Sequence, residues 1–378
     1  MWKPQPFKQR RPSWCTTHPA LADALLSLDD ATYLRLFGDD MALQSFLAQY
    51  IPVFAQLQEL TRLPHAEQPE VETERHLDWA VPGRKWQQID RFTRAIAPIN
   101  GAVLEWCGGK GHLGRVLALR NGVSVTTLER DADLCAEGKR LAERAAVQQL
   151  FHRVDVLSPK LLPLATGHAV ALHACGELHR TLVRKAVVEG VVSLDIAPCC
   201  YHLGSGEYYN PFTDDTRLQL GHDDLRLAVT GNVTSSAREV RLRDQEMAWK
   251  LGFIALRADL EQDDSYRNLR PVDKSWLKGD FETFCRLLAA REAVGLTADI
   301  DWQHYEEMGW LRQREVMRLS LPRHAVRRAL ELWLVLDMSL ALQDHGYEIR
   351  LETFCPTYIS PRNILLSARR SVRFNQID

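Results

Sequence analysis

VLEWCGGKGHLG, residues 103–114, is the stretch that decides the fold. An apolar run ends in the acid Glu105, a group of glycines follows, and apolar residues then recur at helical spacing as far as Gly122. This order predicts a β-strand, a tight turn and an α-helix. A ligand can approach the bare backbone of such a turn, and the N–H groups that begin the helix point towards it. The stretch therefore predicts a site for a nucleotide-like cofactor at the carboxyl end of a parallel strand.

The acid beside the turn indicates which cofactor binds. The pyrophosphate of a dinucleotide would meet like charge at Glu105, whereas S-adenosylmethionine has no phosphate and carries a sulfonium, an ammonium and a ribose diol. We therefore predict S-adenosylmethionine. The spacing of Gly109, Gly111 and Gly114 also fits the dinucleotide fingerprint, so a nicotinamide oxidoreductase is the alternative enzyme.

Two further predicted strands end in acids. Residues 124–129 alternate and end in Glu129, and residues 148–155 end in Asp155. The second acid can chelate the ribose hydroxyls, and the third can accept a hydrogen bond from the adenine amino group. The residues that we expect around the cofactor are Glu105, Cys107, Gly108, Gly109, Gly111, Glu129, Asp155 and His173.

Two later predicted strands end in polar and thiol side chains. Residues 169–176 read AVALHACG and lead into a helix, and residues 191–202 read VVSLDIAPCCYH and lead into a loop. Because ligands of open α/β sheets bind outside the carboxyl ends of the strands, we expect these side chains near the cofactor. The candidate catalytic residues are His173, Asp195, Cys199, Cys200, Tyr201 and His202.

Methyl transfer requires an aligned acceptor and, for a hydroxyl or amine, a group that takes its proton. Asp195 is the candidate for orienting or deprotonating the acceptor, and His202 or His173 is the candidate base because imidazole titrates near neutral pH. Tyr201 can stack on a planar acceptor base, although packing in the core is an equally good interpretation.

The cysteines allow two other interpretations. RNA 5-methylcytosine methyltransferases use two cysteines at places similar to Cys175 and Cys199, one of them as a nucleophile. Together with Cys200, His173 and His202 these residues are also of the types that bind zinc. Their spacing is not that of a known zinc finger, and small buried thiols are the simpler explanation. We therefore expect no metal.

The motifs together resemble methyltransferase domain family 32. The resemblance rests on E-x-x-x-G-K-G-x-L at residues 105–113, H-x-C-G at 173–176 and C-C-Y-H at 199–202. It covers about residues 83–205, and SPRN at 360–363 resembles a late segment of these proteins. The family includes tRNA ribose methyltransferases that act in the acceptor stem, methyltransferase-like proteins and glutathione-S-transferase-C-terminal-domain-containing proteins.

The resemblance implies both a fold and an activity. The fold is α/β and of the class I Rossmann-like kind, with a mostly parallel seven-stranded sheet that ends in an antiparallel hairpin and carries added helical regions. The activity is S-adenosylmethionine-dependent methyl transfer, with tRNA or rRNA as the expected substrate. The chain lacks the Cys/His zinc finger of the tRNA enzymes. The alternatives are therefore a methyltransferase of a small molecule or protein, and a cofactor-binding module without catalysis.

Composition and pattern suggest four regions in a cytoplasmic protein. The chain has 378 residues, a net charge of −2 and eight unevenly spaced cysteines, which fits reduced thiols. No signal core begins the sequence, and the apolar stretch 332–342 is broken by Asp337, so we expect no membrane segment. The expected regions are an N-terminal helical region 1–82, a methyltransferase core 83–275, a helical insertion 276–345 and a C-terminal hairpin 346–378 that completes the sheet.

Basic side chains gather in the expected insertion. Basic stripes neutralise phosphates, so we expect RNA as a partner of the Arg-rich insertion. Interspersed glutamates favour an ordinary solvated helix instead. The arginines of the insertion are Arg312, Arg314, Arg318, Arg323, Arg327 and Arg328, and a second group comprises Arg238, Arg241 and Arg243.

Overall fold

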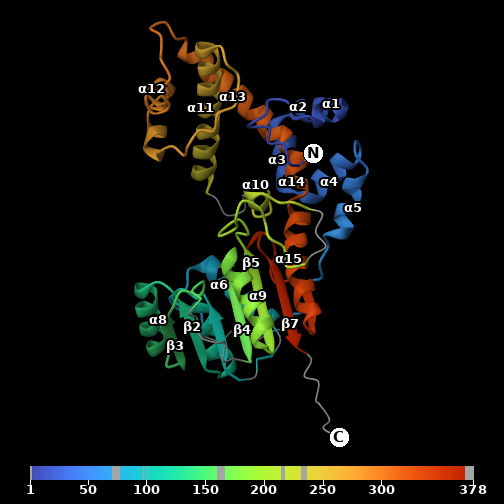
Figure 1. Cartoon of the computed structure of the whole chain (residues 1–378), viewed down its shortest axis with the longest axis vertical. Helices are drawn as coiled ribbons and strands as arrows, with labels where there is room; N and C mark the ends of the chain where they lie inside the picture. Colours follow the sequence, from blue (N-terminus) through green and yellow to red (C-terminus); the bar gives the residue numbers. More distant parts are fainter. Residues whose placement is uncertain are drawn as a thin grey trace. The chain divides into compact units, whose positions relative to one another are not determined.

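The computed structural model describes residues 2–69, 77–96, 98–99, 101–159, 167–213, 218–230 and 236–370. The chain divides into two compact units (Figure 1). Unit 1 comprises Met1–Leu60 and Thr234–Val326, and unit 2 comprises Thr61–Val233 and Arg327–Asp378. Among the described residues, no helix combines the length and apolar character that a membrane crossing needs.

Unit 2 is built on a seven-stranded sheet in the order β3-β2-β1-β4-β5-β7-β6. Strands β1 to β5 are parallel, and β7 runs antiparallel to both β5 and β6. This arrangement confirms the predicted class I Rossmann-like methyltransferase fold, including its final hairpin. The strands are β1 (Val103–Trp106), β2 (Val125–Glu129), β3 (Gln149–Arg153), β4 (His168–Cys175), β5 (Ser193–Cys199), β6 (Tyr347–Thr353) and β7 (Ile364–Arg370).

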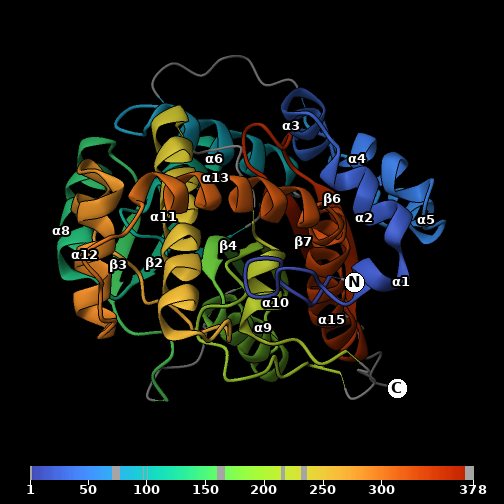
Figure 2. The same cartoon turned by 90° about the horizontal axis from the view of Figure 1, so that it is seen from above.

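Helices cover both faces of this sheet (Figure 2). On one face, α6 and α7 bury Phe92, Val116 and Leu117 against strand residues such as Val125 and Val170. On the other face, α9 packs on β4 and β5, and α15 packs on β6 and β7. The order reverses between β1 and β4, which is where open α/β sheets bind ligands. The helices of unit 2 are α6 (Gly83–Ala95), α7 (His112–Asn121), α8 (Ala132–Arg144), α9 (Glu177–Glu189), α10 (His222–Leu227) and α15 (Arg327–Asp344).

Unit 1 is helical in its described part. Its first five helices share a core with α13 and α14, in which Leu21 and Leu43 pack with Leu319. A second core joins α11, η1, α12 and α13 around Phe253 and Phe284. The elements are α1 (Trp14–Thr17), α2 (Pro19–Leu26), α3 (Asp30–Gly38), α4 (Asp40–Ala48), α5 (Val53–Leu60), α11 (Ala237–Glu261), η1 (Lys274–Lys278), α12 (Phe281–Glu292), α13 (Trp302–Leu319) and α14 (Leu321–Ala325).

The two units differ from the expected regions in where two helices lie. Helix α11 falls within the expected core 83–275 but belongs to unit 1, because Trp249 and Phe253 pack in the core that it shares with α12. Helix α15 falls within the expected insertion 276–345 but belongs to unit 2, where it packs on β6 and β7. The N-terminal helices and residues 234–326 form one unit instead of two separate additions.

Helices α11 and α13 approach each other closely at two glycines, Gly252 and Gly309. A Cβ atom added at Gly309 would lie 2.3 Å from the carbonyl oxygen of Ala248 and 2.9 Å from the nitrogen of Gly252. Gly309→Ala is therefore expected to force the helices apart and to lower the free energy of unfolding by about 1–3 kcal/mol. Denaturant unfolding measures this loss. Gly295→Ala is the control, because an added Cβ there meets nothing within 4 Å. Equal stabilities of the two variants would contradict the prediction.

Candidate active site

The glycine turn joins β1 to α7 as the sequence predicts. Its backbone has positive φ at Cys107, Gly109 and Gly111, with values of 55°, 61° and 63°. The N–H of Gly111 donates to the carbonyl oxygen of Gly108 at 3.0 Å, which closes the turn. A Cβ atom added at Gly109 would meet nothing within 4 Å. The turn therefore presents bare backbone to open space, as a ligand-binding turn requires.

A cavity of about 510 Å³ lies beside this turn. Its volume is within the range of small-molecule sites. The turn contributes Glu105, Cys107, Gly108 and Gly109, β4 contributes His173, and α6 supplies much of the remaining wall. The structure thus brings five of the predicted cofactor residues to one cavity. The wall from α6 and the β4 end consists of Pro82, Arg84, Lys85, Gln88, Ile89 and Leu172.

Glu105 is almost completely buried at the floor of the turn. Its Oε2 accepts hydrogen bonds from Thr127 Oγ1 at 2.7 Å and from Gln149 Nε2 at 3.4 Å. Burial raises the pKa of its carboxyl group to about 7, against the opposing effects of the Thr127 hydrogen bond and of the charges of Lys85 and Arg115. A carboxyl group with this pKa gains from a cationic ligand, because the added positive charge favours its ionised form.

The raised pKa of Glu105 makes stability depend on pH. Its folded pKa of about 7 exceeds the ordinary value of 4.5, so the folded protein holds the proton more tightly than the unfolded chain. The free energy of unfolding of the ligand-free protein should therefore fall by about 3 kcal/mol as pH rises from about 4.5 to 7. Glu105→Gln should lose this component in denaturant unfolding measured across that pH range. A variant with the same slope as the wild type would refute the assignment.

The two other strand-end acids adjoin the turn. At the end of β2, Glu129 Oε2 accepts the N–H of Gly109 at 3.0 Å, and its Oε1 accepts the N–H groups of Arg130 and Asp131 at 2.8 and 2.9 Å. Asp155 follows β3 and is exposed, and its Oδ1 accepts the N–H of Leu157 at 3.0 Å. Neither acid lines the cavity. Cys107 does line the cavity. Burial is the largest cause that raises the pKa of its thiol, to about 12, and the charges of Glu129 and Asp155 act in the same direction.

His173 occupies an irregular point of β4. The pairing with β5 shifts register between Leu172 and Cys175, and His173 has a φ of 65°. Its Nε2 lies 3.0 Å from Gln88 Oε1 of α6. Because the amide oxygen only accepts, Nε2 carries the hydrogen and Nδ1 is left as an acceptor. Burial, with a smaller effect of Arg362, lowers the pKa of His173 to about 4. The imidazole is therefore neutral at physiological pH.

The C-C-Y-H motif lies at the end of β5 but outside the cavity lining. Cys199 Sγ lies 3.4 Å from Cys175 Sγ, and Cys200 adjoins both thiols. The Tyr201 side chain is buried and packs edge-on against His179. It lines a separate cavity of about 210 Å³. The ring of His202 lies against that of His222, with centroids 5.3 Å apart. The Tyr201 side chain therefore packs in the core, which was one of the two interpretations of the sequence. The other was stacking on an acceptor base.

Asp195 corrects the sequence interpretation. We expected it near the cofactor, as a group that orients or deprotonates the acceptor. Strand β5 runs to Cys199, so Asp195 lies inside the sheet opposite Val170 and Ser367. The strand can continue through Pro198 because β7 pairs with β5 only as far as Ile196. Proline has no backbone N–H, but at position 198 no hydrogen bond to β7 requires one.

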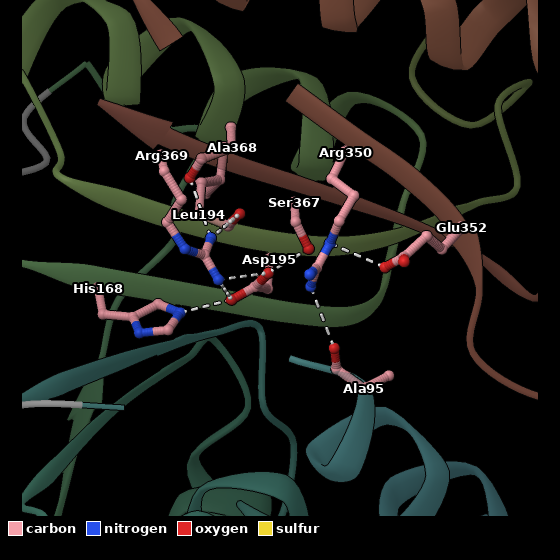
Figure 3. Close-up of polar contacts among 9 residues, drawn as sticks. All are labelled: Ala95, His168, Leu194, Asp195, Arg350, Glu352, Ser367, Ala368 and Arg369. Atoms are coloured by element: carbon pink, nitrogen blue, oxygen red, sulfur yellow. Dashed lines mark hydrogen bonds and ion pairs between the residues drawn. The ribbon is translucent and has the colours of Figure 1, made fainter. Parts of the chain in front are cut away.

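The carboxylate of Asp195 is fully occupied within the sheet (Figure 3). One oxygen accepts from His168 Nε2 at 2.6 Å, the other accepts from Ser367 Oγ at 2.6 Å, and Arg369 Nη2 lies 3.0 and 2.9 Å from the two. The side chain has no solvent exposure and does not line the cavity. Asp195 is therefore part of a buried ionic cluster of the sheet.

Sequence reasoning missed the polar residues that surround the site from other elements. Lys85 and Gln88 line the cavity from α6, and Gln149 reaches under the turn from the first residue of β3. The sequence predicts the helix before β1, and its two polar residues stand three apart, as one helical face requires. The spacing does not show whether that face of the helix lines a cavity or faces solvent.

The sheet order and the cavity beside the glycine turn are those of a class I Rossmann-like methyltransferase fold. The domain family comparison agrees: residues 84–206 match the model of a methyltransferase domain family, the one numbered 32. The match covers less than half of the chain and confirms the resemblance that the motifs indicated.

Solved structures with a similar arrangement include three methyltransferases. A glycopeptide N-methyltransferase complexed with S-adenosylmethionine is 23% identical over 34% of this chain and 59% of that chain, with a TM-score of 0.25. The Pyrococcus abyssi tRNA (uracil-54, C5)-methyltransferase in complex with S-adenosyl-L-homocysteine is 20% identical over 30% of this chain and 28% of that chain, with a TM-score of 0.24. A 23S rRNA methyltransferase is 18% identical over 30% and 45%, with a TM-score of 0.25. The chain thus spans less than two thirds of each. Because these TM-scores are low, the assignment rests on the sheet topology and the domain match.

Proposed function

We propose that this protein is an S-adenosylmethionine-dependent methyltransferase whose acceptor is RNA. The observation that carries the methyl-transfer part is the glycine turn at the switch point of the sheet, within residues that match a methyltransferase domain. The turn meets the requirements of the cofactor, because Gly109 exposes bare backbone and Glu105 supplies a buried carboxylate to the cavity.

The bound cofactor supplies an electrophilic methyl group on a sulfonium. In the proposed site Glu105 favours the cationic portion of the cofactor, and Glu129 and Asp155 bind its ribose and adenine. His173 lines the same cavity, and its neutral imidazole has an acceptor nitrogen at Nδ1. It is therefore our candidate for orienting the acceptor or holding its proton, a role for which Asp195 lacks a free oxygen atom.

RNA is supported by basic side chains near the end of β5. Burial lowers the pKa of His202, and His222, Arg226 and Arg362 act in the same direction, so each of the three lies within electrostatic reach of His202. Arg362 also lies within electrostatic reach of Cys200 at the end of β5. Cationic groups beside a methyl-acceptor site suit the phosphates of a nucleic acid.

Several arginines of the expected RNA platform have structural roles instead. Arg318 is buried and donates to the carbonyl oxygen of Leu28 and to Asp30. Arg323 is buried among the carbonyl oxygens of residues 2–4, and Arg312 donates to Glu315 and to Pro6. We therefore move the proposed RNA contact of unit 1 to the exposed side chains of α11, namely Arg238, Arg241 and Arg243.

Reversing charge on α11 is expected to weaken RNA binding. Arg238→Glu with Arg241→Glu should lower affinity at low salt and reduce the slope of log affinity against log salt by about 2, since two phosphate contacts are lost. Arg35→Glu with Arg286→Glu is the matched control, because it changes the charge of unit 1 equally at other exposed positions. Fluorescence anisotropy with labelled tRNA measures both. Equal weakening in the two double variants would argue against α11 as an RNA-binding surface.

The acceptor class is tested by following the methyl group. Purified protein is incubated with S-adenosylmethionine labelled in the methyl group and with RNA, protein and metabolite fractions from a strain that lacks the gene. Label in the RNA fraction, located by mass spectrometry of nucleosides, is the expected result. Label only in protein or metabolites would replace RNA by that acceptor class. Cofactor binding without transfer to any fraction would support a binding module without catalysis.

A further inference from the structure

Three thiols meet at the carboxyl ends of β4 and β5. The sulfur atoms of Cys175, Cys199 and Cys200 all lie within 4.8 Å of one another, and those of Cys175 and Cys199 are 3.4 Å apart. Cys175 and Cys199 are register partners on neighbouring parallel strands, and Cys200 follows directly. In the described part of the chain, this is the one group of three or more potential metal ligands brought this close.

The backbone around these thiols is held in unfavourable conformations. Cys200 has a φ of 47°, and His173 beside the β4 bulge has a φ of 65°. A residue other than glycine in the left-handed region costs of the order of 1–3 kcal/mol and persists only where its surroundings impose it. In this protein His173 and Cys200, which both have that backbone conformation, lie at or beside the cluster of three sulfur atoms.

Zinc binds cysteine as the thiolate, so the three thiols would release three protons to solvent when the ion binds. Three thiolates around a divalent ion carry a net charge of −1, and the guanidinium of Arg362 lies within electrostatic reach of Cys200.

We propose that Cys175, Cys199 and Cys200 together bind one zinc ion. Zinc–sulfur bonds of about 2.3 Å place sulfur atoms roughly 3.8 Å apart at tetrahedral angles, so the observed separations need only small side-chain rotations. The ion fastens the ends of β4 and β5 to the start of the loop that carries Tyr201 and His202. The fourth position is taken by water or by His202, whose Nδ1 is buried without a hydrogen-bond partner in the described structure.

This inference departs from the absence of metal expected from the sequence. The ligands are adjacent in space because two parallel strands pair in register, although Cys175 and Cys199 are 24 positions apart along the chain. Finger-like spacing describes ligands on one hairpin or one turn, so it gives no signal for ligands on paired strands.

Cobalt titration tests the proposal directly. The full chain is purified reduced and anaerobically, stripped with a chelator and titrated with Co²⁺. We expect one equivalent to bind with the near-ultraviolet absorption of cobalt–thiolate bonds, and one equivalent of Zn²⁺ to remove that absorption. Cys200→Ser and Cys175→Ser should each abolish it. Cys135→Ser, which alters a buried thiol of α8 that packs with Phe151 of β3, should leave it intact.

Two further measurements keep the outcomes distinct. Circular dichroism and S-adenosylhomocysteine binding show whether each variant folds, and they test the cofactor site independently of the metal. No cobalt–thiolate absorption in the folded wild type, or unchanged absorption in Cys200→Ser, would overturn the zinc site. A Cys175–Cys199 disulfide in the protein as isolated, found by peptide mass spectrometry before reduction, would replace it by a redox pair. A covalent adduct with 5-fluoropyrimidine RNA would instead identify one of the thiols as a nucleophile.

Discussion

Gly109→Val should abolish the binding of S-adenosylhomocysteine. In the wild-type turn, a Cβ at Gly109 would project into space that no protein atom fills within 4 Å, at a residue that lines the cavity. A branched side chain there would occupy the approach path of the cofactor. It would also strain a backbone with a φ of 61°, and the N–H of this residue anchors Glu129. Isothermal calorimetry should show at least 100-fold weaker binding, a loss of about 2.7 kcal/mol or more.

The chain offers a matched control for this experiment. Gly122 has a φ of 65°, and an added Cβ would likewise meet nothing within 4 Å. It ends helix α7, whose ten residues begin at the turn, so it lies about 15 Å away along the helix. Gly122→Val should therefore lose as much stability as Gly109→Val while keeping cofactor affinity. Full affinity in Gly109→Val, or equal loss of affinity in both variants, would remove the turn as the cofactor site.

The strand-end acids were predictable because each depends on local order along the chain. An apolar run followed by an acid and glycines fixes where a strand ends, and parallel strands bring such ends to one edge. Glu105 and Glu129 therefore fell where the sequence placed them. The groups around Glu105 were not predictable, because its hydrogen-bond partner Gln149 and the charge of Lys85 come from other elements and reach the site only through packing.

Asp195 and helix α11 show why other parts were not predictable. We expected Asp195 among the side chains near the cofactor, but β5 continues past it to Cys199 because β4 pairs with it that far. How far a neighbouring strand extends the pairing cannot be read from the local sequence. Helix α11 lies in the part of the sequence that we assigned to the methyltransferase core, and α15 lies in the expected insertion. Apolar spacing can indicate a helix, but it does not say whether the buried face of that helix packs on a sheet or on other helices.

Asp195→Ala is expected to lower the free energy of unfolding of unit 2, and we expect no direct effect on the catalytic step. The change would leave Arg369 without its carboxylate partner and would remove the carboxylate that accepts from His168 and Ser367 inside the sheet. Breaking a buried ion pair from one side costs about 3–5 kcal/mol. Denaturant unfolding measures the loss. The double variant Asp195→Ala with Arg369→Met should recover part of it, because no unpaired guanidinium then remains.

The pH dependence and the activity of the folded variant separate this role from an acid–base one. His168, Arg369 and Ser367 outweigh burial and lower the pKa of Asp195. The contribution of the carboxylate to stability is therefore complete above its ordinary pKa of 3.8 and is lost as pH falls through the lower folded value. The advantage of the wild type over Asp195→Asn should accordingly shrink below about pH 4. Folded Asp195→Asn should bind S-adenosylhomocysteine and transfer methyl groups as the wild type does. Normal stability with a loss of turnover on the order of 100-fold would instead return Asp195 to the catalytic site.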